Sequence, residues 1–224
     1  KVCIRNLETE KTEGDIKTMW TKELFGTEKP IIALLHLDPL PGDPDFCGSL
    51  DTVIEHASCD VKALQEGGVD GVLIANEFSF PMTYISHTET LMAMACVIGA
   101  IKKDIHVPFG TNVVMNPEET IRMAKAVGAS FGRSAFAGAF TGTYGVHVNN
   151  FGENVRLKYA LGIPEMKLLC KINPEGDVLL AEQSIEEIID NVTLGDHVGA
   201  FCVSGPGAGQ EASWDLLAHV CDLA

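Results

Sequence analysis

Polar side chains of the kinds used in catalysis and binding occur where short apolar runs of this sequence end. In chain order they are His36, Asp38, Asn76, Glu77, Asn112, Arg133, Lys171 and Ser204. A buried parallel strand delivers its last residues to one rim of a sheet or barrel. We therefore expect these side chains to meet at a common opening.

His36 and Asp38 are two positions apart, so an extended strand presents both on one face. As a pair they suit acid–base catalysis, with His36 moving protons and Asp38 orienting the imidazole, or they suit ligation of a divalent metal. A structural interpretation is also open, in which His36 hydrogen-bonds within the mouth of the fold and Asp38 caps the loop before Pro39. No other cofactor is indicated.

Glu77 is the strongest carboxylate candidate for a general base. Apolar residues, Ala75 and Phe78, stand close to it in the sequence, and such surroundings favour a proton-accepting role near neutral pH. The alternative is a salt bridge from Glu77 to Arg133 or Lys171 across the rim.

Arg133 and Lys171 are the only basic residues at predicted strand ends in a chain with 16 Lys and Arg residues. A phosphate or carboxylate ligand requires such a pair, and Asn112 would add an amide. Lys171 also has the side chain for a Schiff base with a carbonyl substrate. The competing interpretation is that Lys171 neutralises Glu77 or Asp38.

A glycine-rich segment, SGPGAG at 204–209, precedes a helix predicted at 213–223. Glycines before a helix let backbone N–H groups approach an anion, so Ser204, Gly205 and Gly207 are predicted to bind substrate. A tight strand-to-helix turn without a ligand is the alternative.

Six strand–helix units in succession are predicted to position these residues. The predicted strands begin near residues 31, 71, 109, 129, 167 and 199, and their mean spacing of about 34 residues is typical of βαβ units. No run of hairpins interrupts them, and residues 135–149 are predicted to form a long loop. Polar strand ends and the absence of a GxGxxG motif after the first strand favour an α/β fold of the TIM (β/α)8 barrel type, with only about six of its modules present.

The domain boundaries follow from this pattern. Residues 1–28 are predicted to be an arm with a short helix, and 29–224 an incomplete barrel. The helix is predicted from Asp15 to Gly26, with Trp20 and Leu24 on its apolar face. It could cover the bottom of the barrel, and the alternative is a mobile appendage.

Composition narrows the classes of partner. A net charge of −15 argues against nucleic acid, and the sequence has no apolar run long enough to span a membrane. Seven cysteines without a CxxC pair indicate reduced thiols and a cytoplasmic location. We expect a small anionic ligand as the partner and, from the frequency of symmetric dimers, a homo-oligomer.

Five stretches of this sequence resemble the BtpA family of TIM-barrel proteins, and its SgcQ-type branch in particular. They are ALLHLDPLPGDP at 33–44, GGVDGVLIANEFSFP at 67–81, VPFGTNVVMNP at 107–117, the glycine-rich stretch 136–145, and FCVSGPGAG at 201–209. The chain departs from the main family pattern at Met115–Pro117, in CKINPEG at 170–176, and at Asn76-Glu77.

The resemblance implies the barrel and leaves the reaction open between two hypotheses. In the first, the chain is an enzyme that acts on a small phosphorylated, sugar- or nucleoside-like compound, with catalytic His36, Glu77 and Lys171. In the second, it is a non-catalytic assembly factor, because the family is associated with photosystem I biogenesis.

Overall fold

The computed structural model of this chain describes residues 2–4, 19–207 and 209–224. The strands of the main sheet are β1 (Val2–Ile4), β2 (Ile32–His36), β3 (Gly71–Ala75), β4 (Phe109–Asn112), β5 (Phe131–Ser134), β8 (Lys167–Lys171) and β10 (Ala200–Cys202). The α-helices are α1 (Trp20–Phe25), α2 (Leu50–Glu66), α3 (Thr88–Ile101), α4 (Pro117–Val127), α5 (Phe151–Ala160), α6 (Ile185–Thr193) and α7 (Trp214–Leu223), and a short 3-10 helix, η1 (Lys102–Asp104), follows α3.

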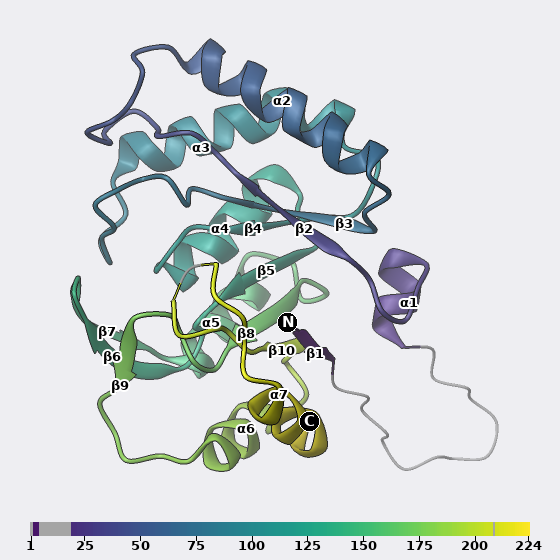
Figure 1. The fold of residues 1–224 in the computed structure, drawn as a ribbon, viewed down its shortest axis with the longest axis vertical. Coiled ribbons are helices and arrows are strands. Elements are labelled where there is room, and N and C mark those ends of the chain that lie inside the picture. Colours follow the sequence, from purple (N-terminus) through teal and green to yellow (C-terminus); the bar gives the residue numbers. More distant parts are fainter. Residues whose placement is uncertain (1, 5–18, 208) are drawn as a thin grey trace.

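The main sheet has the order β1-β10-β8-β5-β4-β3-β2. The six predicted strands, from β2 to β10, are all parallel and lie in sequence order, so the predicted strand–helix units are confirmed. β1 adds antiparallel to β10. Figure 1 shows the sheet curling within a layer of helices, as in part of a TIM barrel. Within the described residues the sheet ends at β2 and β1 and does not close.

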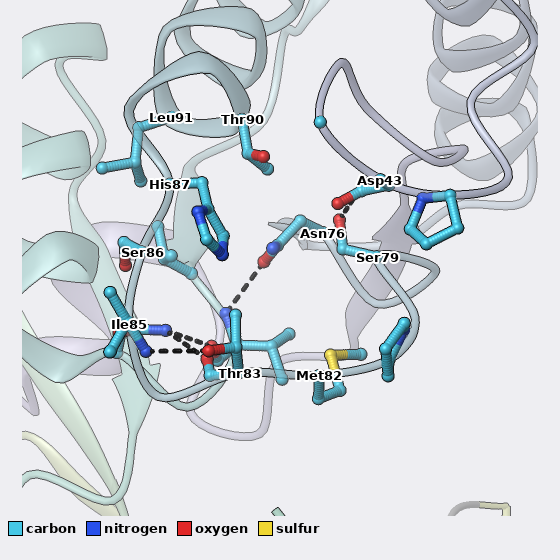
Figure 2. A pocket seen from close by; sticks show the side chains of 16 residues that line it. Asp43, Asn76, Ser79, Met82, Thr83, Ile85, Ser86, His87, Thr90 and Leu91 are labelled. Carbon is cyan, nitrogen blue, oxygen red and sulfur yellow. Dashed lines mark hydrogen bonds between the residues drawn. The ribbon is translucent and has the colours of Figure 1, made fainter.

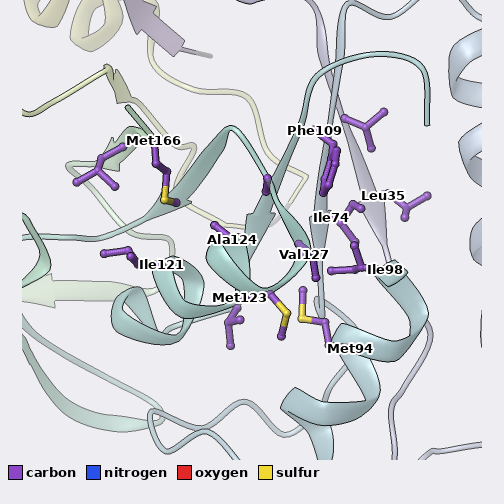
Figure 3. Packing of buried hydrophobic residues seen from close by; sticks show 14 of the residues in the cluster. Leu35, Ile74, Met94, Ile98, Phe109, Ile121, Met123, Ala124, Val127 and Met166 are labelled. Carbon is purple, nitrogen blue, oxygen red and sulfur yellow. The ribbon is translucent and has the colours of Figure 1, made fainter. Parts of the chain in front are cut away.

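The outer face of the sheet carries the larger core. Leu35, Val72 and Ile74 of β2 and β3 pack against helical residues that include Val97 and Ile98 of α3, all 1% exposed or less. Figure 3 shows this packing of strand and helix side chains. The alternation along each strand leaves the intervening residues for the inner face, where the predicted site residues lie.

The inner face has a smaller core at its lower end, and α1 covers it. Leu73, Phe131 and Leu169 are buried there, with Trp20, Leu24 and Phe25 packed against them. The Phe25 and Phe131 rings meet edge to face at 5.6 Å. Gly26, at φ 76°, ends α1. The helix therefore covers the bottom of the barrel as predicted, although residues 15–18 of the predicted helix lie outside the described residues.

The prediction of a long loop at 135–149 is wrong. This segment forms a hairpin of β6 (Gly138–Gly142) and β7 (Gly145–Asn149), and β9 (Asp177–Leu179) pairs with β6 to complete a second, three-stranded sheet. The hairpin follows β5 and β9 follows β8, so this second sheet is built from loops at the carboxyl ends of the barrel strands.

None of the helices in the described part of the chain combines the length and the apolar character needed to cross a bilayer.

Candidate functional site

The strand register brings three of the predicted residues into one row on the inner face. His36 pairs laterally with Ala75, and Ala75 with Asn112. Thr111 pairs with Gly132, which sets Asn112 beside Arg133. Laterally paired residues of parallel strands point to the same face. His36, Asn112 and Arg133 therefore line the open side of the curled sheet near its carboxyl rim.

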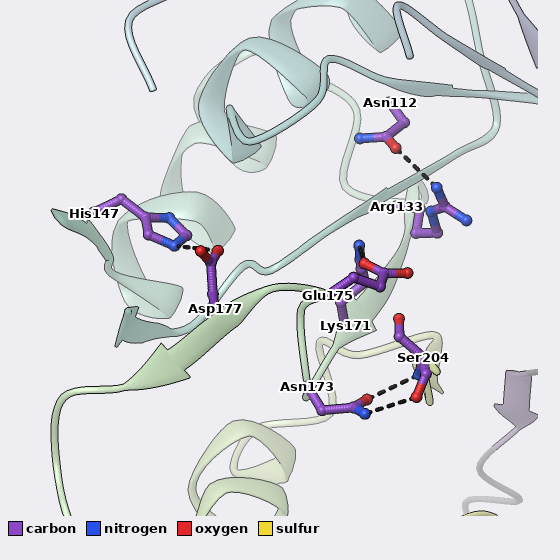
Figure 4. Close-up of polar contacts among 8 residues, drawn as sticks. All are labelled: Asn112, Arg133, His147, Lys171, Asn173, Glu175, Asp177 and Ser204. Atoms are coloured by element: carbon purple, nitrogen blue, oxygen red, sulfur yellow. Dashed lines mark hydrogen bonds and ion pairs between the residues drawn. The ribbon is translucent and has the colours of Figure 1, made fainter. Parts of the chain in front are cut away.

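Arg133 and Asn112 are in direct contact. Arg133 Nη2 donates to Asn112 Oδ1 at 3.2 Å, and the Asn112 side chain is buried (Figure 4). The Arg133 Nε atom is also buried but has no hydrogen-bond partner within the described residues. A buried guanidinium N–H without a partner is costly, so this donor is available to a ligand or a bound water.

His36 shows the same feature on the first strand of the row. Its Nε2 atom is buried and has no hydrogen-bond partner in the described part of the chain. Phe78 meets the imidazole edge to face, with ring centroids 5.7 Å apart. The inner face thus holds two buried polar atoms, Arg133 Nε and His36 Nε2, that have no partner among the described residues, and Phe78 of the loop after β3 lies against the His36 ring.

Lys171 belongs to the same face, one step nearer the rim. Leu169 pairs with Arg133, and Lys171 lies two residues further along β8. Its ammonium group contacts the Glu175 carboxylate (Figure 4). Burial tends to raise the pKa of Glu175. The charge and hydrogen bond of Lys171, with further hydrogen bonds that include the Ser204 hydroxyl, outweigh burial and lower the pKa. Lys171 is therefore held by Glu175, a residue that sequence reasoning missed, and it does not neutralise Glu77 or Asp38.

Asp38 does not form the predicted pair with His36. Its Oδ2 atom lies 2.6 Å from His56 Nδ1 of α2, so the carboxylate is directed to the helix layer. β2 ends at His36, and the strand alternation that would place both side chains on one face stops there. Within the described residues no cluster of three His, Cys, Asp or Glu side chains is arranged to hold a metal ion.

Asn76 and Glu77 directly follow β3, at the carboxyl rim of the sheet. Asn76 Oδ1 accepts from the Val114 backbone N–H at 2.8 Å, so this amide ties the loop after β3 to the loop after β4. Glu77 is half-buried just beyond it, and no ion pair joins it to Arg133 or Lys171 in the described structure.

The glycine-rich segment does not lie at a helix N-terminus. α7 begins at Trp214, with Ser213 as its cap, so Gly205 and Gly207 are well separated from it. Ser204 is fixed instead by Asn173, whose side chain accepts from the Ser204 N–H at 2.9 Å and donates to the Ser204 carbonyl at 2.8 Å. A Cβ on Gly205 would lie 2.3 Å from the Gln210 carbonyl oxygen. The absence of a side chain at Gly205 thus lets the loop fold back on itself, which is the tight-turn alternative.

A second polar cluster lies in the three-stranded sheet and was not predicted. His147 Nε2 lies 3.3 Å from Asp177 Oδ2, an ion-pair distance without hydrogen-bond geometry (Figure 4). Tyr84 stacks on the imidazole at 4.2 Å and donates to Asp177 Oδ1 at 3.3 Å. Burial lowers the pKa of His147 although Asp177 opposes this, and burial together with Asp177 raises the pKa of Tyr84 to about 12. The period-two pattern of Gly145–Asn149 is the signal that could have revealed the strand carrying His147.

Burial also makes two cysteines near the site, Cys170 and Cys202, unreactive. Cys202 pairs laterally with Lys171, and burial raises the pKa of its thiol although Arg133 and Lys171 lower it. Burial raises the pKa of Cys170 to about 12. Both thiols stay protonated at neutral pH and act as small core residues.

Comparisons with known proteins agree with this architecture. The model of the BtpA family matches residues 27–224. SgcQ, a putative sgc region protein of Escherichia coli K12, is 43% identical over 203 residues, which is 90% of this chain and 76% of SgcQ. The photosystem I biogenesis protein BtpA of a Synechocystis species is 32% identical over 143 residues, which is 62% of this chain and 50% of that protein.

A solved structure supports the fold independently. 7,8-Dihydropteroate synthase from Vibrio fischeri superposes with a TM-score of 0.54 at 17% identity, over 85% of this chain and 68% of the synthase. At that identity the likeness concerns the fold alone, which is an α/β fold with a partial barrel of the TIM type. Because the family model matches residues 27–224 and SgcQ is 43% identical over 90% of this chain, the chain belongs to the BtpA family.

Proposed function

We propose that the inner face of the half-barrel binds a small anionic molecule and that the chain is an enzyme of the SgcQ type. The observation that supports this proposal is the row of His36, Asn112 and Arg133 beside the cation Lys171. Two buried atoms of this row, His36 Nε2 and Arg133 Nε, have no hydrogen-bond partner among the described residues. A phosphorylated sugar- or nucleoside-like compound has the charge and the hydrogen-bonding groups to fill this row.

Roles follow from chemistry and position. Arg133 and Lys171 bind the anionic group, and Asn112 holds the guanidinium in place. His36 carries a proton to or from the substrate, since a neutral imidazole can both donate and accept. Glu77, half-buried at the end of the neighbouring strand, is the second proton carrier. Phe78, which meets the imidazole edge to face, supplies an apolar contact beside the substrate.

The test is a calorimetric titration with inorganic phosphate, ribose 5-phosphate and unphosphorylated ribose. We expect the two phosphates to bind and Arg133→Gln to weaken them by about ten-fold or more, the loss expected when a charged hydrogen bond is removed. Arg122→Gln is the matched control, because Arg122 is an exposed arginine of α4 paired with Glu118 and Glu119. Equal phosphate affinity in both variants would contradict the proposal.

A second candidate function, assembly of a protein complex, is favoured by one surface. Val146, Val148, Val178 and Leu180 are 53–74% exposed on one face of the three-stranded sheet. An apolar face of this kind suits a partner protein or a second copy of the chain. An assembly factor would keep its partner in Arg133→Gln and lose it in Val148→Lys.

The free thiols of the described cysteines support the cytoplasmic location proposed for either function.

A further inference from the structure

A cavity separate from the inner row lies between the loops that follow β2, β3 and β4. Its volume is about 300 Å³ (Figure 2). Its lining comes from residues 42–44, from part of the segment 76–91 that leaves out Glu77 and Phe78, and from Val113, Val114 and Asn116. His36, Asn112, Arg133 and Lys171 are not among the lining residues. The cavity is therefore distinct from the proposed anion site.

One wall of the cavity presents a carboxylate that is held in a fixed position. Asp43 Oδ2 accepts from the Leu40 backbone N–H and from the Ser79 hydroxyl, both at 2.6 Å. These two hydrogen bonds fix the carboxylate plane and occupy one oxygen. Among the described residues no hydrogen bond reaches the other oxygen, which is thus an acceptor for a ligand hydroxyl.

The lining also presents two amides whose orientations are fixed. Asn116 Nδ2 donates to the carbonyls of Thr83 and Val114, at 3.2 and 2.8 Å, so its Oδ1 is left as an acceptor. Asn76 uses its Oδ1 on the Val114 N–H, so its Nδ2 is left as a donor. The Ser86 hydroxyl is buried at the same site without a partner in the described structure. The cavity thus offers donors and acceptors on side chains that are already positioned.

The charge of the lining limits the chemistry of the ligand. The lining contains no lysine or arginine, and its titratable side chains are Asp43 and His87. An anion would therefore meet the Asp43 carboxylate without a permanently charged cation beside it. Met82, Leu91 and Val113 supply apolar surface between the polar groups. The lining therefore combines hydroxyl-binding groups with surface for C–H faces, in a space near the lower limit of small-molecule sites.

We propose that this cavity binds an uncharged polyhydroxylated molecule the size of one sugar ring. Hydroxyl groups of such a ligand donate to Asp43 and Asn116 and accept from Asn76. This proposal does not depend on the anion site, because none of the residues assigned to that site lines the cavity.

The test is a ligand-observed NMR titration of the whole chain with D-ribose, D-glucose and myo-inositol. We expect saturable binding of at least one of them. Asp43→Asn should weaken it by about ten-fold, the loss expected for a hydrogen bond to a charged group. Asp45→Asn is the matched control, since Asp45 is an exposed carboxylate outside the lining, and it should leave the affinity unchanged.

Two further variants make the result decisive. Met82→Trp adds a bulky ring to the lining while every polar lining residue is retained, and it should abolish binding. Arg133→Gln should leave it intact, so failure of phosphate binding at the inner row is distinguished from failure here. Absence of saturable binding by all three compounds, or binding that survives both Asp43→Asn and Met82→Trp, would overturn the proposal.

Discussion

Lys171 and Glu175 show how a single carboxylate tunes a cationic site. Glu175 contacts the ammonium group that the proposed anion would use, so the two compete for Lys171. We predict that Glu175→Gln tightens phosphate binding by about three- to ten-fold, because an opposing charge is removed at short range, and that Lys171→Met weakens it. Calorimetry measures both. Glu182→Gln, an exposed acid, is the control, and unchanged affinity in Glu175→Gln would remove Lys171 from the site.

His147 is expected to make stability depend on pH. Burial lowers its pKa, while Asp177 and Tyr84 are the titratable groups that face it. Below its ordinary value of about 6.5 the unfolded imidazole binds a proton that the folded one excludes, so the free energy of unfolding falls as pH decreases. The slope from this group is at most about 1.4 kcal/mol per pH unit.

Urea unfolding at about pH 7.5 and about pH 5.5 measures this dependence. His147→Gln should lose less stability between the two pH values than the parent chain does. Tyr84, with its pKa raised to about 12, stays protonated throughout and does not contribute. His106→Gln, at an exposed histidine, should behave like the parent. The same pH dependence in His147→Gln as in the parent would show that the imidazole titrates as it does in the unfolded chain.

Residues at strand ends could be predicted from sequence, and residues on connecting segments could not. Asn112, Arg133 and Lys171 were found because a parallel strand fixes which side chains reach its rim. Glu175 and Asp177 lie on the segment after β8, whose path depends on the turn and on the pairing of β9. Their positions are set by tertiary packing that no local pattern encodes.

At the scale of elements, β4 and β5 pair closely because β4 has a glycine, Gly110, beside Phe131 of β5. A Cβ on Gly110 would lie 2.3 Å from two carbons of the Phe131 ring and 2.8 Å from its carbonyl oxygen. We predict that Gly110→Ala destabilises the fold by about 1–3 kcal/mol, the usual cost of overpacking. Gly99→Ala in α3 is the control, since nothing lies within 4 Å of its Cβ, and it should be neutral or stabilising. Urea denaturation of both variants tests this, and equal stability would mean that the ring moves aside freely.

The strand–helix units were predictable because apolar runs alternate with helix-period patterns, and six such units recur at a mean spacing of about 34 residues. The second sheet was not predicted. Glycines and aromatics in 135–149 resemble a loop in composition, and only the short alternation in Gly145–Asn149 indicates a strand. β9 is three residues long, too short for any periodicity to appear.

At the scale of the molecule, the open sheet leaves β2 with a neighbour on one side only, within the described residues. Leu34 on this strand is 43% exposed. Every second N–H group of such an edge strand points away from its only partner. We predict faster amide hydrogen exchange in β2 than in β3, which has a strand on each side. Equal protection in exchange mass spectrometry would show that another segment covers this edge in solution.

Binding of an anion at the inner face is tested most directly by a crystal structure determined with inorganic phosphate. We predict density for phosphate within hydrogen-bonding distance of the Arg133 guanidinium and the Lys171 ammonium, with His36 facing it. Density at that position in the parent and its loss in Arg133→Gln would support the account. An inner face that holds no anion at saturating phosphate, or an anion bound away from both cations, would contradict it.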